Sequence, residues 1–83
     1  MNYPVIVDVT LREGIADPEG ATIERALPAL GFMGVTNVRA GKSFRLEVEA
    51  NDEAAALQKA TALAERLLSN PVIENAVARS GKA

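Results

Sequence analysis

Two stretches of this 83-residue chain place apolar side chains at every second position. The apolar positions are Val5, Val7, Val9 and Leu11 in the first stretch and Phe44, Leu46 and Val48 in the second. Because successive side chains of a β-strand point to opposite faces, this spacing predicts two strands that each bury one face. In the second stretch the intervening side chains, Arg45, Glu47 and Glu49, are charged, which assigns its solvent-facing side.

A helix is predicted to begin after Asp17. Its carboxylate can accept hydrogen bonds from the free amides of a first helical turn, and Pro18 fits the next position because it has no amide proton to leave unpaired. The apolar positions that follow, at spacings of three and four, are Ile23, Ala26, Leu27 and Leu30. Gly31 can adopt the left-handed conformation that ends a helix. Pro28 removes the amide that would bond to the carbonyl of Glu24, so we expect a kink or a loosened last turn.

A second helix is predicted after Asn51 or Asp52, either of which can cap its first turn. Its alanine-rich apolar stripe, which allows a close approach to a sheet, consists of Leu57, Ala60, Ala64 and Leu67. Asn70–Pro71 ends this helix, because proline disfavours the helical conformation in the residue before it. Residues 72–77 then form a last strand.

Residues 35–50 are predicted to form a strand pair with a turn near Gly41, although the sequence leaves open a single long bent strand. The resulting order, β-α-β-β-α-β, is the ferredoxin-like split βαβ arrangement. It is a two-layer α+β fold, an antiparallel four-stranded sheet with two helices on one face. The chain is predicted to be a single domain, residues 1–83, with a frayed polar tail at 79–83.

The composition limits what such a fold can do. The chain has neither cysteine nor histidine, which excludes disulfides, thiolate metal sites and histidine-based proton transfer or metal binding. A core this small favours self-association as additional support. The formal net charge of −2 argues against a nucleic-acid partner. No stretch approaches the roughly 20 apolar residues of a membrane span, and the start carries no signal sequence, so we expect a cytoplasmic chain with no membrane partner.

The sequence offers no credible catalytic, cofactor-binding or metal-binding site. Gly41-Lys42-Ser43 has the end of a phosphate-binding loop, but Thr36 stands where that loop needs a glycine, and a strand follows where it needs a helix. The acidic residues Asp17, Glu19 and Glu24 are explained by the dipole of the first helical turns. The few serines and threonines lack a histidine or lysine partner that could act as a base.

Three separated runs identify a family. They are Asp17–Gly20 before the first helix, Val38–Lys42 in the strand pair, and Leu67–Glu74 near the end. In order and spacing they resemble the PurS family, the small subunits of phosphoribosylformylglycinamidine synthase, a purine-biosynthetic enzyme that many bacteria and archaea divide among three chains. Five residues within and between these motifs are expected to have structural roles: Asp17, Pro18, Gly20, Gly31 and Gly41.

The resemblance implies a non-catalytic subunit of an ATP-dependent glutamine amidotransferase and ligase complex. In that family the large synthetase subunit (PurL) uses ATP and Mg, and the glutaminase subunit (PurQ) releases ammonia from glutamine. The small subunit, as a dimer, bridges the two so that ammonia can pass between them. The resemblance therefore implies a homodimer or dimer of dimers that binds no cofactor itself and has no activity alone.

Four residues are candidate partner contacts: Arg39, Lys42, Asn70 and Pro71. Arg39 and Lys42 occupy strand and turn positions that the resemblance marks as typical of the family, but their charge could equally serve to discourage edge-to-edge aggregation. Asn70–Pro71 stops a helix, and a rigid exposed turn also suits docking. The alternative function is a regulatory module of the ACT type, which shares the β-α-β-β-α-β order and would bind a small molecule at the turn formed by residues 13–17.

Overall fold

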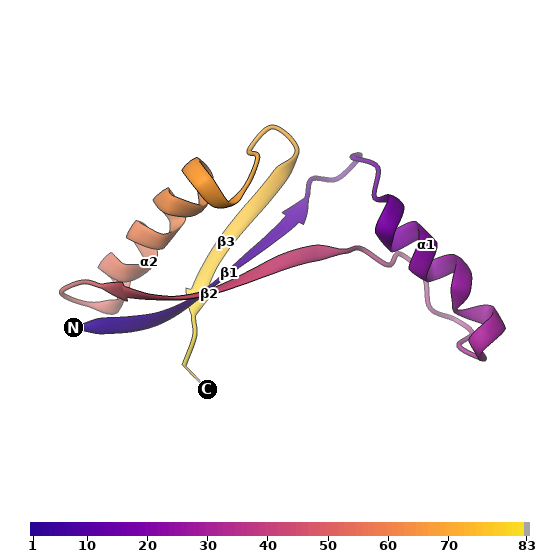
Figure 1. Cartoon of the computed structure of the whole chain (residues 1–83), viewed down its shortest axis with the longest axis horizontal. Coiled ribbons are helices and arrows are strands. Elements are labelled where there is room, and N and C mark those ends of the chain that lie inside the picture. Colours follow the sequence, from indigo (N-terminus) through magenta and orange to yellow (C-terminus); the bar gives the residue numbers. More distant parts are fainter. Residues whose placement is uncertain (83) are drawn as a thin grey trace.

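The computed structural model describes residues 1–82 of the chain. Its elements are, in order, β1 (Asn2–Leu11), α1 (Pro18–Ala26), the 3₁₀ turn η1 (Pro28–Leu30), β2 (Gly41–Glu49), α2 (Glu53–Leu63), the π-helical turn η2 (Ala64–Leu68) and β3 (Glu74–Ser80). The molecule measures 50 × 30 × 14 Å. Figure 1 shows the reason for this length: α1 lies beyond the end of the sheet, far from α2.

Three strands form one antiparallel sheet within residues 1–82, in the order β2-β1-β3. Val7 of the central strand pairs with Phe44 of β2 on one side and with Ala78 of β3 on the other. The predicted four-stranded sheet is therefore wrong. Residues 35–40, which were expected to supply the additional strand, form a connection, and β2 begins only at Gly41.

The backbone of this connection explains why it forms no strand. Gly34 has a φ of 78° and Asn37 a φ of 58°, in the left-handed region that glycine and asparagine tolerate best. Two such residues so close together interrupt an extended conformation. Residues 35–40 therefore turn back along α1 before the chain enters the sheet.

The amides of the connection are also already bonded. The Val38 amide donates to the carboxylate of Glu24, and the Ala40 amide donates to the carboxylate of Asp17. A neighbouring strand would need these same donors. The helix side chains thus satisfy the connection in place of a strand partner.

The core lies between α2 and one face of the sheet. Its buried side chains are Val5, Val7, Val9, Val48, Ala56, Ala60 and Ala64. The predicted burial of Val5, Val7 and Val9 in β1 is confirmed, because each is at most 1% exposed. Leu11 is only partly buried, and Ile6, on the opposite face, is buried as well. The buried alanines of α2 leave little side chain between the helix and the sheet, as the sequence indicated.

The π-helical turn η2 changes which leucine enters the core. The amide of Ser69 donates to the carbonyl of Ala64, five residues earlier, so this turn is wider than an α-helical one. Leu68 packs against the core, whereas Leu67 is 74% exposed. The prediction that Leu67 belongs to the apolar stripe is wrong because the sequence pattern assumes an α-helical period.

The limits of α1 are confirmed, but its packing is not. Asp17 caps the helix, Pro18 is its first residue, Pro28 begins the loosened turn η1, and Gly31 ends that turn with a φ of 88°. Within α1 only Gly20 is buried. The prediction of two helices on one face of the sheet is wrong, because in the described part of the chain α2 alone covers it (Figure 1).

The C-terminal strand begins at Glu74 and ends at Ser80, both later than predicted. It was expected at 72–77, but it continues to Ser80, and the amide of Gly81 still donates to a β1 carbonyl at 2.8 Å. A frayed tail from residue 79 is therefore wrong, and Ala83 lies outside the described residues. No helix within residues 1–82 is long and apolar enough to cross a membrane.

Candidate interaction surface

Asp17 is more than a helix cap. Its Oδ1 accepts a hydrogen bond from the amide of Gly20 at 2.9 Å, and its Oδ2 accepts one from the amide of Ala40 at 2.8 Å. The Nε atom of Arg39 lies 3.8 Å from Oδ2. The backbone hydrogen bonds, and after them the Arg39 charge, hold the pKa of Asp17 below its usual value. With a side chain that is 6% exposed, Asp17 joins α1 to the connection that leads into β2.

The same joint requires a glycine at position 20. A Cβ atom there would collide with the carbonyl oxygen of Val38. Farther along α1, Oε1 of Glu24 accepts from the amide of Val38 at 2.9 Å. The conformational freedom of glycine is not what matters at this motif position. Its lack of a side chain lets the connection approach the helix.

Arg39, a predicted partner contact, lies against its own chain. Its Nη2 donates to the carbonyl oxygen of Ile15 at 3.3 Å and to that of Arg12 at 3.5 Å. Its side chain is nevertheless 45% exposed. Arg39 therefore joins the chain segment that leaves β1 to the segment that enters β2.

Lys42, at the start of β2, reaches across the sheet. Its Nζ lies 3.9 Å from the carboxylate of Glu74, at the start of β3, although β1 separates the two strands. Glu74 also accepts from the amide of Asn70 at 2.7 Å. A cleft of about 290 Å³ lies here between the sheet and the beginning of α1, with Leu11 and Pro18 in its lining. At this distance and exposure the ion pair itself contributes little stability.

Asn70 and Pro71 form the turn between η2 and β3. The Oδ1 of Asn70 accepts from the amide of Val72 at 3.1 Å, and the carbonyl of Pro71 accepts from Nε of Arg12 at 3.0 Å. The side chains of Val72 and Leu67 are 79% and 74% exposed. The predicted docking turn is thus fixed by its own chain and bordered by exposed apolar residues.

Two residues that sequence reasoning missed as site residues bring the four candidates together. Arg12 donates to Pro71 and accepts from Arg39 through its carbonyl, and Glu74 contacts both Lys42 and Asn70. All four candidates therefore gather around the end of β1. Their role as partner contacts stays a prediction. The position of Arg12 directly after a strand was the available sequence signal, but its partners lie too far along the chain to be inferred.

A set of exposed apolar side chains was also missed. They lie on α1, on η1 and in the connection after it, are 45% to 75% exposed, and are Ile23, Leu30, Phe32, Met33 and Val35. The sequence pattern placed Ile23 and Leu30 on the apolar face of a helix and Val35 in a strand, and it left Phe32 and Met33 unassigned. The isolated chain leaves this surface in contact with water.

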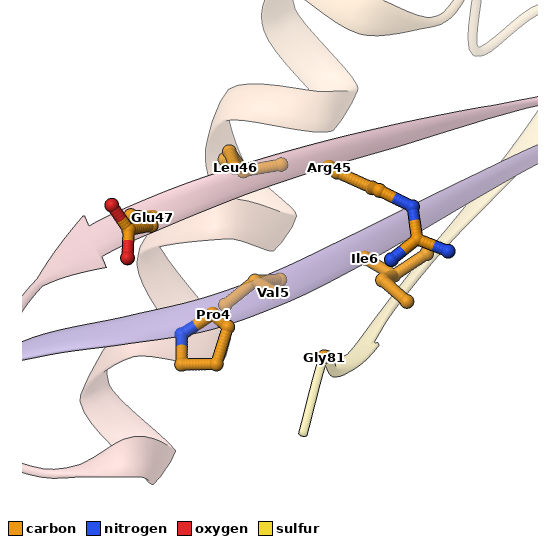
Figure 2. A pocket seen from close by; sticks show the side chains of 7 residues that line it. All are labelled: Pro4, Val5, Ile6, Arg45, Leu46, Glu47 and Gly81. Atoms are coloured by element: carbon orange, nitrogen blue, oxygen red, sulfur yellow. The ribbon is translucent and has the colours of Figure 1, made fainter. Parts of the chain in front are cut away.

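The face of the sheet opposite α2 carries a pocket of about 400 Å³. Its lining consists of Pro4, Val5, Ile6, Arg45, Leu46, Glu47 and Gly81, and Figure 2 shows the side chain of Arg45 reaching toward Ile6. The charged groups at this pocket, Arg45 and Glu47, do not make a nucleophile with a neighbouring base. Within residues 1–82, no group of three or more acidic side chains could hold a metal ion.

Comparison with known proteins gives a consistent answer. The sequence model of the family described as PurS, phosphoribosylformylglycinamidine (FGAM) synthase, matches residues 4–80. A phosphoribosylformylglycinamidine synthase subunit PurS from Synechocystis is 43% identical over 74 residues, which cover 89% of this chain and 74% of the relative. The PurS subunit from Archaeoglobus fulgidus is 43% identical over 68 residues, covering 82% of this chain and 85% of the relative.

Solved structures agree with the sequence comparisons. The crystal structure of the PurS subunit from Thermotoga maritima matches with a TM-score of 0.88 at 38% identity, covering 96% of this chain and 92% of the other. A chain in the structure of PurLQS from the same organism matches with a TM-score of 0.86 at 38% identity, covering 96% of this chain and 98% of that chain. The projecting position of α1 is therefore included in a close structural match.

Proposed function

The chain belongs to the PurS family of FGAM synthase, an enzyme of purine biosynthesis, and we propose that it is the small subunit that joins a large synthetase chain to a glutaminase chain. The observation that carries this proposal is the match to a chain of the PurLQS structure over almost the whole of both chains. The family assignment favours this function over an ACT-type regulatory module. As a component of purine biosynthesis, the chain is proposed to work in the cytoplasm.

The proposed role is structural support for ammonia transfer. ATP, Mg and glutamine are used by the partner chains, and this chain binds no cofactor. The test is FGAM synthesis by the reconstituted three-chain complex, with glutamine and with free ammonia as alternative nitrogen donors. Leaving out this chain should lower the glutamine-dependent rate far more than the ammonia-dependent rate. Equal rates with and without it would contradict the proposal.

The shape of the chain supports a homodimer or a dimer of dimers. Its radius of gyration is 15.9 Å, whereas a compact chain of this length has a radius of about 12 Å. The excess comes from α1 and its flanking segments, which we call the arm and define as residues 12–40. The arm leaves apolar side chains in water, and covering them with another surface lowers the free energy.

A second copy of the chain is the proposed cover for the arm. Leu30, on the arm, is 69% exposed, and Val72, in the turn before β3, is 79% exposed. Leu30→Asp should therefore reduce the mass measured by light scattering to that of the 8.7 kDa monomer, while Val72→Asp should leave it unchanged. A Leu30→Asp variant with the wild-type mass would show that the arm is not the dimer contact.

The turn at Asn70–Pro71 is the proposed contact for a partner chain. It is exposed, and its neighbours Leu67 and Val72 are apolar. Val72→Asp should weaken association with the large synthetase chain in a pull-down between purified proteins. Glu65→Gln, an exposed polar change nearby, is the control. Equal retention of both variants would move the contact elsewhere.

A further inference from the structure

The arm is attached to the sheet by two chain segments, residues 12–17 and 38–40. Since α1 does not pack on the sheet, the angle between the arm and the sheet must be set where these segments run. Figure 1 shows both of them crossing the gap between α1 and the strands. If no side-chain contacts held these two segments, the arm could rotate about them as about a hinge.

Near α1, two carboxylates hold residues 38–40 to the helix. Asp17 holds the amide of Ala40 at 2.8 Å, and Glu24 holds the amide of Val38 at 2.9 Å. The absence of a side chain at Gly20 allows residues 38–40 to lie against α1. The helix and residues 38–40 therefore move together.

Near the sheet, Arg12 holds the start of the outgoing segment in place. Its amide donates to the carbonyl of Ile73 at 2.7 Å, which continues the pairing of β1 with the chain before β3. Its Nε donates to the carbonyl of Pro71 at 3.0 Å. The first residue of the arm is thus held to the turn that leads into β3.

Arg39 connects these two fixed parts. Its guanidinium lies between the carbonyl oxygens of Arg12 and Ile15 on the outgoing segment and the carboxylate of Asp17 at the helix. A planar guanidinium can donate in several directions at once, which a lysine ammonium in the same place could not reproduce with the same geometry.

We propose that Asp17, Arg12 and Arg39 form a brace that sets the angle between the arm and the sheet. The brace is a property of the chain alone, so it can be tested without the partner chains. It also goes beyond the proposed subunit role, which would hold whether the arm were rigid or hinged. Because the individual contacts of Arg39 are long and partly exposed, the brace biases the angle and can be released by a single substitution.

The arm angle is measured as a distance between two spin labels. The chain contains no cysteine, so Ala29→Cys on the arm and Gln58→Cys on α2, both exposed, provide unique attachment sites. Labelled chain is mixed with excess unlabelled chain, so that the distances arise within one molecule. Pulsed electron–electron double resonance then gives the distribution of distances between the two labels.

The variants come in matched pairs. Arg39→Gln should broaden the distribution and shift its mean. Arg25→Gln should leave it unchanged, because Arg25 is an exposed arginine on α1 whose side chain donates to Thr22 of the same helix. Asp17→Asn should broaden it as well. Asp52→Asn makes the same change at the cap of α2, where the side chain accepts from the amide of Ala55 within that helix, so it should have no effect on the distance.

Two results would overturn the inference. One is a wild-type distribution in both Arg39→Gln and Asp17→Asn, which would mean that the angle is set elsewhere, for example by the second copy. The other is equal broadening in the Asp52→Asn control, which would mean that the effect of Asp17→Asn does not come from its bond to the connection. Circular dichroism identifies a variant that has lost α1, and Arg39→Lys, which keeps the charge, then serves as the second variant and should still broaden the distribution.

Discussion

The π-helical turn η2 makes opposite predictions for two adjacent leucines. Leu68 packs against the core, whereas Leu67 is 74% exposed. Replacing a buried leucine by alanine costs about 2–5 kcal/mol. Since Leu68 is only partly buried, Leu68→Ala should fall at the low end of that range, about 2 kcal/mol. Leu67→Ala should change the free energy of unfolding by less than about 0.5 kcal/mol.

Urea and thermal denaturation of both variants test this contrast. For a domain of this size 1 kcal/mol corresponds to roughly 4–8 °C, so Leu68→Ala should melt roughly 8–16 °C below wild type. Because self-association adds stability that depends on concentration, each variant is compared with wild type at several matched protein concentrations. A Leu67→Ala loss that equals or exceeds the Leu68→Ala loss at every concentration would refute the assignment of the inward face.

Three further predictions concern the arm joint and the chain alone. Gly20→Ala should lower the melting temperature, although alanine favours a helix interior over glycine by about 1 kcal/mol, because the new Cβ would collide with the Val38 carbonyl. Stability should fall as the pH drops below about 4. In the folded chain the Arg79 hydrogen bond lowers the pKa of Asp8, and hydrogen bonds from backbone amides lower the pKa of Asp17. The unfolded chain therefore takes up protons first as the pH falls, which favours unfolding. Urea titrations across pH measure this, and Asp17→Asn should flatten the curve. Purified chain should hydrolyse neither ATP nor glutamine, and turnover that disappears on mutation within it would contradict the proposed role.

The features predicted correctly are those that nearby residues determine. A helix cap at Asp17 or Asp52 depends on amides three residues away, and the alternation of β1 depends on a backbone period of two. The break at Pro28 likewise follows from a missing amide within one turn. Such features are available in the sequence because they need no knowledge of the rest of the fold.

The candidate site was predicted in part for the opposite reason. The family resemblance supplied Arg39 and Lys42, but the residues that connect them to the Asn70 turn, Arg12 and Glu74, act across large sequence separations. The wrong assignment of residues 35–40 as a strand has the same origin. Whether an amide in that stretch pairs with a strand or with a carboxylate of α1 depends on where α1 lies. The alternation of apolar and polar residues carries no information about that position.

The largest error in the predicted fold also provides the best argument for assembly. An apolar stripe on a helix indicates that the sequence has been shaped to bury it, but it does not indicate which chain covers it. On α1 and η1 the stripe includes Ile23 and Leu30, and both remain exposed in the single chain. Within residues 1–82, α2 covers one face of the sheet, and the opposite face carries the pocket that Ile6, Arg45 and Glu47 help to line (Figure 2). The prediction that two helices cover one sheet assumed that the chain satisfies its own pattern, and its failure at α1 is the outcome expected when a second copy supplies the missing surface.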